Sequence, residues 1–210
     1  MALNEQYLQD LSDLFVQDLR GSDYYRSLSE REKQEVEQRL HEEALQGRHP
    51  LLPGADEASL AKLREAAEQE LGIALPVSVQ EVLRQVDGFV ENGVTLYGVD
   101  AEFRGEEFES GPGLIAENSV TWSDTPETAR RYLFVGDSDL WFFAIEIETA
   151  RPVVLDRSSL AQKHLFSSVE DMVEDMLQQA LGIFGENQQD QLQEQHQEHF
   201  EDEGFRFSKN

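Results

Sequence analysis

The sequence contains no cysteine among its 210 residues. This absence excludes a disulfide scaffold, a thiolate metal site and a cysteine nucleophile, and it suits a reducing compartment. Long apolar runs are also missing, since no stretch approaches the roughly 20 residues that a membrane-spanning helix needs. Residues Met1 to Leu11 lack the basic start and the apolar run of a secretory signal. We therefore expect a cytoplasmic protein that does not insert into membranes.

Basic residues are scarce. The chain has 17 Lys and Arg residues against 43 Asp and Glu residues, which gives a formal net charge of -26. A field of that sign repels nucleic acid phosphates and anionic membranes, so neither is an expected partner, whereas a basic protein would be attracted. The excess is concentrated between Asp87 and Ala150. This segment contains 14 acidic residues, and its only basic residues are Arg104, Arg130 and Arg131. Two explanations stay open, namely solubility and a dedicated basic partner.

Motifs that carry chemistry are also missing. No glycine-rich phosphate loop is present, and Ser138 lacks the flanking glycine pattern of a nucleophile elbow. His196 and His199 would share a helix face and, with Glu203, could hold a metal loosely, but structural zinc needs four His or Cys ligands. Neighbouring carboxylates are so frequent at this acidic density that they do not indicate a catalytic pair. We predict no catalytic residue, no metal site and no cofactor.

The most strongly patterned stretch runs from Tyr132 to Asp156. Its apolar runs are short, rich in β-branched and aromatic residues and separated by turn-forming clusters, which predicts antiparallel strands. These runs are Leu133–Val135, Leu140–Ile147 and Val153–Leu155. Alternation places Trp141, Phe143, Ile145 and Ile147 on one side of the middle strand, with Phe142, Ala144 and Glu146 on the other. Such a strand belongs in the middle of a sheet whose apolar side is covered by helices.

The N-terminal part of the chain is helical in pattern. From Asn4 to Leu19, apolar residues recur at intervals of three or four residues, which predicts an amphipathic helix. Ser29 and Glu32 form a capping box for a second helix, which Gly47 ends. Prolines 50 and 53 then break the chain, so we predict an N-terminal helical extension over residues 1–54.

The next segment predicts a helix over Ala55–Leu71 and a short helix after Pro76. Phe89–Gly98 contains Asn-Gly between apolar runs, which is a strong hairpin signal. Val99–Gly113 is predicted to be a loop, and Leu114–Ala116 is interpreted as a short edge strand.

The last third predicts a connector and a final helix. Ser158–Lys163 follows the strands as the connector, and Ser167 with Glu170 forms a second capping box for a helix that ends at Leu181. The main domain thus covers residues 55–185, and residues 186–210 form an acidic polar tail.

The order of short motifs resembles the SUKH superfamily, which includes yeast cell-wall synthesis regulators and many bacterial immunity proteins, and most of all its YrhA-like branch. The matching residues are Leu71-Gly72, Leu75-Pro76, Val82-Leu83, Asp87-Gly88, Tyr97-Gly98, Phe134–Ser138, Trp141–Phe143, Val154–Arg157 and the helix Phe166–Leu181. The resemblance implies an α+β fold with a mostly antiparallel, twisted sheet covered by helices, and no enzyme activity. It does not extend to the helix Asn4–Leu19 or to the tail, and it implies no fixed binding residues.

The leading interpretation is an immunity protein that binds a basic, nuclease-like toxin. The predicted partner-binding residues are Glu102, Glu106, Glu107, Glu109, Trp122 and Asp124. Trp122 lies in a polar stretch and is either a lid on the core, which we favour, or an interface anchor. The alternative is a regulatory scaffold that binds a cellular partner through its helical extension. A homodimer is compatible with either interpretation, and an enzyme ranks last.

Overall fold

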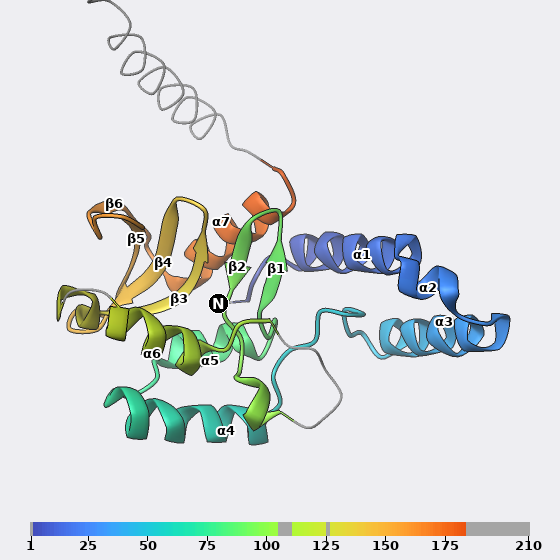
Figure 1. The fold of residues 1–210 in the computed structure, drawn as a ribbon, viewed down its shortest axis with the longest axis horizontal. Coiled ribbons are helices and arrows are strands. Elements are labelled where there is room, and N and C mark those ends of the chain that lie inside the picture. Colours follow the sequence, from blue (N-terminus) through green and yellow to red (C-terminus); the bar gives the residue numbers. More distant parts are fainter. Residues whose placement is uncertain (1, 105–110, 125–126, 184–210) are drawn as a thin grey trace, which may run out of the picture.

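A computed structural model of the chain describes residues 2–104, 111–124 and 127–183. Its centre is one sheet of six antiparallel strands in chain order, so each strand pairs with the next along the sequence (Figure 1). The strands are β1 (Phe89–Glu91), β2 (Val94–Leu96), β3 (Tyr132–Ser138), β4 (Trp141–Glu146), β5 (Arg151–Asp156) and β6 (Gln162–Leu165). The predicted α+β architecture with an antiparallel sheet and helices before it is therefore confirmed.

The aromatic strand β4 lies inside the sheet, as its alternation predicts. It pairs with β3 on one side and with β5 on the other along its length. Residues 142–145 are buried although they alternate between the two faces, so both faces are covered. Trp141 is half-buried and packs against the core.

The hairpin between β1 and β2 turns at Asn92 and Gly93, with φ angles of 48° and 74°. Positive φ at both positions is the requirement of the tight hairpin turn that Asn-Gly predicts. The Asn92 side chain also donates to the Ala180 carbonyl at 2.5 Å. The turn is thereby tied to the end of the last helix, α7 (Val169–Ala180).

Helix α7 packs against the sheet through its apolar side. Gly136 of β3 leaves the space that the Met176 side chain occupies, because a Cβ there would collide with that side chain and with the Thr95 carbonyl. The cap of α7 differs from the predicted box. Ser168, rather than Ser167, accepts from the backbone N–H of Asp171 at 3.0 Å, so the helix starts one residue later.

Two helices precede the sheet within the domain. α4 (Glu57–Ala66) is capped by Asp56 and continues as one π-helical turn, η1 (Ala67–Leu71), which ends at Gly72 with a φ of 68°. The helix predicted over Ala55–Leu71 thus ends where expected, starts two residues later and has an irregular last turn. α5 (Val77–Leu83) follows Pro76.

Three helices form an arm at the N-terminus: α1 (Glu5–Gly21), α2 (Asp23–Ser27) and α3 (Glu30–Leu45) (Figure 1). The root of α1 belongs to the domain, because Leu8 and Leu11 lie in the same core as the sheet and Ser12 donates to the Pro50 carbonyl at 2.7 Å. The predicted capping box is confirmed at the start of α3. The outer part of the arm projects away from the sheet (Figure 1).

Two local predictions are wrong. Leu114–Ala116 is not an edge strand but the first turn of helix α6 (Leu114–Asp124). The connector predicted over Ser158–Lys163 contains the start of β6, whose residues are all exposed and so give no apolar signal. The described part of the loop after Val99 contains the turn η2 (Ala101–Phe103), and a similar turn, η3 (Glu127–Arg131), precedes β3.

Candidate functional site

Helix α6 carries the candidate site, and a distant carboxylate fixes its start. Asp100 is 5% exposed, and its two carboxylate oxygens accept from the backbone N–H groups of Ile115 at 3.0 Å and Ala116 at 2.9 Å. These amides have no partner within the helix, and a carboxylate there also favours the positive end of the helix dipole. Asp100 therefore positions α6 relative to the loop that precedes it.

Helix α6 also completes an open edge of the sheet. Beyond the end of β2, no strand of the described residues pairs with the backbone of β3 on this side, and side chains of α6 bond to it instead. Asn118 accepts from the Phe134 N–H at 2.8 Å and donates to the Phe134 carbonyl at 2.7 Å. Trp122 donates its indole N–H to the Tyr132 carbonyl at 3.0 Å. These bonds satisfy buried backbone groups that would otherwise be costly.

Trp122 is therefore placed as a lid, half-buried and packed against the core. Its remaining accessible part lines a shallow depression of about 360 Å³ together with Ser123, Glu127 and Arg130. The depression is polar and open, with a carboxylate and a guanidinium from η3 at its rim. Whether Trp122 also anchors a partner stays a prediction.

The other predicted residues lie at the two ends of α6. Asp124 is exposed at its last residue, and Glu102 is exposed in η2, two residues after the Asp100 that caps the helix start. An 11-residue helix is about 16 Å long, so Asp124 lies about that far from the helix start that Asp100 caps. Glu106, Glu107 and Glu109 lie outside the described residues.

A residue that the sequence interpretation missed lies between these ends. Val120 is 57% exposed on the solvent side of α6, in line with Ala116 one turn earlier. We call this surface the α6 face and define it by Ala116, Val120, Ser123, Asp124 and Glu127. Helical spacing would have pointed to Val120, but the segment was interpreted as a strand followed by a polar stretch.

Beside α6, the carboxylates of Glu117 and Asp137 lie close to the guanidinium of Arg157. Burial raises the pKa of Glu117, and the nearby charges of Asp137 and Asp100 raise it further. Arg157 forms an ion pair with Asp137 at 2.9 Å, and its guanidinium lies 5.1 Å from the centre of the Phe142 ring. Burial likewise raises the pKa of Tyr97, with Asp137 as the next cause.

A carboxyl group with a raised pKa is what a general acid requires, but the same shift follows from packing a carboxylate among others. In the ranges that the structure describes, no three His, Asp or Glu side chains come together as a potential metal site. Arg157 also donates to the Ser138 carbonyl at 2.8 Å, so its bonds join β3 to the end of β5. The geometry gives this cluster a structural role.

A buried ion pair holds the loop that carries Glu102. Arg104 contacts Asp87 at 2.6 Å, and the two side chains are 12% and 5% exposed. Asp87 also accepts from the Val99 N–H at 2.7 Å. Burial raises the pKa of Asp87, and these two donors oppose the shift. The pair anchors η2 at both of its ends.

The described part of the chain has no helix that is both long and apolar enough to cross a membrane. Comparison with protein families finds no matching family model, and no curated protein matches the chain. Among solved structures, the chain is similar to a protein from Pseudomonas syringae pv. tomato at 20% identity and a TM-score of 0.43. The match covers 60% of this chain and 85% of that one. A likeness at this level does not bear on function.

Proposed function

We propose that this chain is a non-enzymatic binding protein, an immunity protein that neutralises a cognate bacterial toxin by covering its active surface. The observation that carries the proposal is the composition of the α6 face. Val120 is a large apolar side chain left 57% exposed, and acidic groups lie at both ends of the helix that presents it. An apolar centre with a charged rim is the general anatomy of a protein interface.

Charge supports a basic partner. The net charge of -26 produces a field that draws in a cationic protein, such as a nuclease whose surface is built to hold phosphates. In this arrangement Glu102, Asp124 and Glu127 steer the approach, and Val120 with the accessible part of Trp122 supplies the apolar contact. Covering the active surface of the toxin is enough to neutralise it, so this chain does not have to catalyse a reaction. The resemblance to the SUKH superfamily in the order of motifs points to the same class of function.

The direct test is rescue in cells. The chain is co-expressed with each candidate toxin encoded by the genes beside its own, in a host that the toxin kills, and survival and complex formation are measured. We expect protection together with a stable complex of the two purified proteins. A host that dies at the same rate with and without the chain, and purified proteins that do not associate, would refute the proposal.

Matched variants then test the α6 face. Val120→Glu should weaken binding by about tenfold or more, since it places a charge at the apolar centre. Val77→Glu is the control, because Val77 is a similarly exposed valine, at 66%, on a different helix, α5. Glu102→Lys and Asp124→Lys should lower the association rate, and high salt should lower it in the unmodified protein. Glu81→Lys, an exposed position of α5, serves as the charge control. Equal losses in test and control variants would place the interface elsewhere.

A regulatory scaffold that binds through the arm is the second candidate, because the outer arm projects from the domain (Figure 1). Deletion of residues 1–47 is a poor test, since it would also remove the core residues Leu8 and Leu11. Tyr24→Glu is better, because Tyr24 is 63% exposed on α2. Loss of a cellular partner with toxin protection intact would favour the scaffold.

A further inference from the structure

The outer arm, which we define as residues 20–48, exposes most of its surface. Among the residues that the structure describes in α2 and α3, only Leu40 is buried. Two of the three most exposed large apolar side chains of the described residues are here: Leu45 is 73% exposed and Tyr24 is 63% exposed. They lie at opposite ends of the outer arm, one before α3 begins and one at its last residue.

Helix α3 also presents a stripe without acidic or basic side chains, apart from one histidine. It consists of Gln34, Gln38, His41 and Leu45, all of them exposed. Their spacing of four, three and four residues places them on one face and is the spacing of a coiled-coil seam. Charged side chains flank the stripe, with Arg31 and Glu35 joined at 2.9 Å and Glu42 accepting from Gln38 at 2.7 Å. This uncharged stripe between charged flanks leaves one face of α3 available for contact with another helix.

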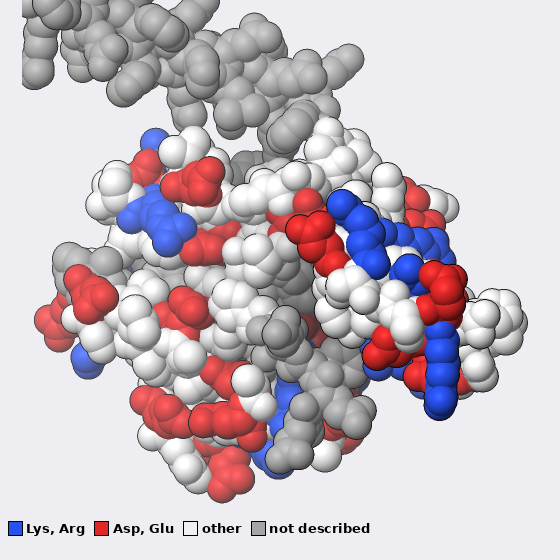
Figure 2. Space-filling model, turned by 45° about the vertical axis from the view of Figure 1, so that its right-hand side comes forward, with Lys and Arg blue, Asp and Glu red and all other residues white. Residues whose placement is uncertain are grey.

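The charge of the outer arm differs from that of the rest of the chain. Residues 20–48 contain seven acidic and six basic side chains, which leaves 36 acidic and 11 basic side chains elsewhere. The outer arm is therefore nearly neutral, whereas the remainder has a net charge of -25. Figure 2 shows blue and red side chains interspersed over the arm and mainly red ones over the domain. Two copies of this acidic protein can approach at the arm without strong repulsion.

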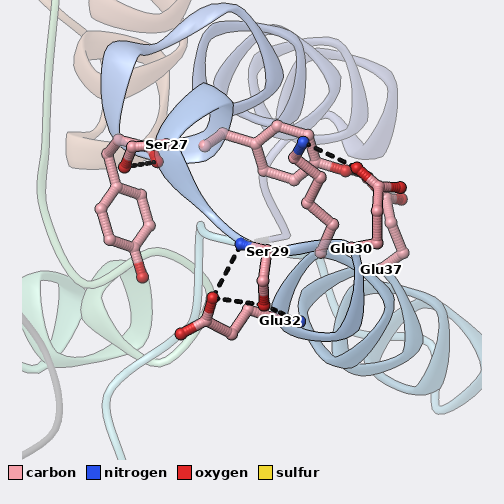
Figure 3. A network of polar contacts seen from close by, with 8 residues as sticks. Ser27, Ser29, Glu30, Glu32 and Glu37 are labelled. Carbon is pink, nitrogen blue, oxygen red and sulfur yellow. Dashed lines mark hydrogen bonds and ion pairs between the residues drawn. The ribbon is translucent and has the colours of Figure 1, made fainter.

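The fold holds the outer arm in a fixed conformation before any contact forms. Glu37 of α3 accepts from Arg20 at 2.9 Å and 2.6 Å and from the Tyr25 hydroxyl at 2.8 Å, which joins the end of α1, α2 and α3. The Ser29 N–H donates to Glu32 at 2.8 Å in the capping box that starts α3 (Figure 3). A surface ordered in this way loses little conformational entropy on binding.

From these observations we propose that the outer arm binds a second copy of this chain, with the two α3 helices antiparallel about a two-fold axis. A two-fold contact uses the same surface on both copies. In the antiparallel arrangement, the Leu45 end of each α3 meets the Tyr24 end of the other, across a helix of 16 residues and about 24 Å. Each exposed apolar side chain then gains a partner. The inference is independent of toxin neutralisation.

Sedimentation velocity of the full chain tests the association. We expect a concentration-dependent dimer, and Leu45→Glu or Tyr24→Glu should weaken it by about tenfold or more. Val77→Glu, which alters an equally exposed apolar residue outside the arm, should leave it unchanged. A chain that stays monomeric at every concentration, or a dimer that Val77→Glu disrupts as strongly, would overturn the proposal. Circular dichroism confirms that each variant is folded.

Cross-linking tests the orientation, because a chain without cysteine accepts single probes cleanly. Tyr24→Cys and Leu45→Cys are prepared separately, and each is treated with a short bis-maleimide reagent, alone and mixed. The antiparallel arrangement predicts efficient cross-linking only in the mixture. Efficient cross-linking of each variant with itself would indicate parallel arms and would contradict the proposal, as would no cross-linking in any sample.

Discussion

At the scale of single residues, Asn118 is the side chain on which the position of α6 depends most. It is fully buried and substitutes for a missing strand by bonding both backbone groups of Phe134. Its amide also donates to the Leu114 carbonyl of its own helix at 2.8 Å. The α6 face is thus presented by a helix that Asn118 fixes to the sheet, together with the indole bond of Trp122 to Tyr132.

Asn118→Ala should lower the free energy of unfolding by about 3 kcal/mol, because the Phe134 N–H and carbonyl would stay buried without partners. Urea unfolding followed by tryptophan fluorescence measures the loss. Ser119→Ala is the matched control on the next residue of the helix, and it should change stability by less than about 0.5 kcal/mol. Equal effects of the two substitutions would show that water or another group replaces the amide.

At the scale of elements, alternation was enough to predict β4 and helical periodicity was enough to predict α1. Their apolar residues are close in sequence and face one core. α6 could not be predicted in the same way, because its cap is Asp100 and its inward side includes Asn118 and Trp122. These contacts join segments that are distant along the chain, so a local pattern contains no sign of them. Val120 was missed because the start of α6 was interpreted as a strand, so helical spacing was not applied to it.

The outer arm offers a pH-dependent measurement at this scale. The Arg20 guanidinium, and after it the Tyr25 hydroxyl, lower the pKa of Glu37 from 4.5 to about 2. A lowered carboxyl pKa stabilises the folded arm above pH 4.5, and this contribution is lost as the pH falls from 4.5 towards 2. Glu37 is 38% exposed, so solvent and salt reduce the effect.

Carboxyl NMR of Glu37 should therefore show a titration midpoint of about 2. Arg20→Gln should move this midpoint upwards more than Tyr25→Phe, in the order of their contributions. Glu35→Gln, which removes a carboxylate of the Arg31 pair on the same helix, is the control and should leave the midpoint in place. A midpoint near 4.5 in the unmodified protein would mean that the contacts of Glu37 do not persist in solution.

At the scale of the whole molecule, the arm and the domain share one hydrophobic core. Leu3, Leu8 and Leu11 belong to the same buried cluster as Phe143 of the sheet. The backbone adds two bonds, from the Leu3 N–H to Gln85 at 2.7 Å and from the Asn4 N–H to Glu174 at 2.9 Å. The sequence places an extension before a domain, because prolines break the chain between them, yet the core crosses that break.

A shared core predicts that the root of the arm and the sheet unfold together. Leu11→Ala should lower the free energy of unfolding by about 2–5 kcal/mol, because it opens a cavity at a fully buried position. Leu45→Ala changes the same residue type at a site that is 73% exposed, and in dilute solution its effect should stay within about 0.5 kcal/mol.

A fragment that begins at Ala55 should lose cooperative unfolding, since it leaves the surface that Leu8 and Leu11 cover open to water. Far-UV circular dichroism and tryptophan fluorescence should give coincident transitions for the full chain. A fragment that unfolds at the same urea concentration as the full chain would instead show that the arm is dispensable, and the extension and the domain would then be separate units of folding.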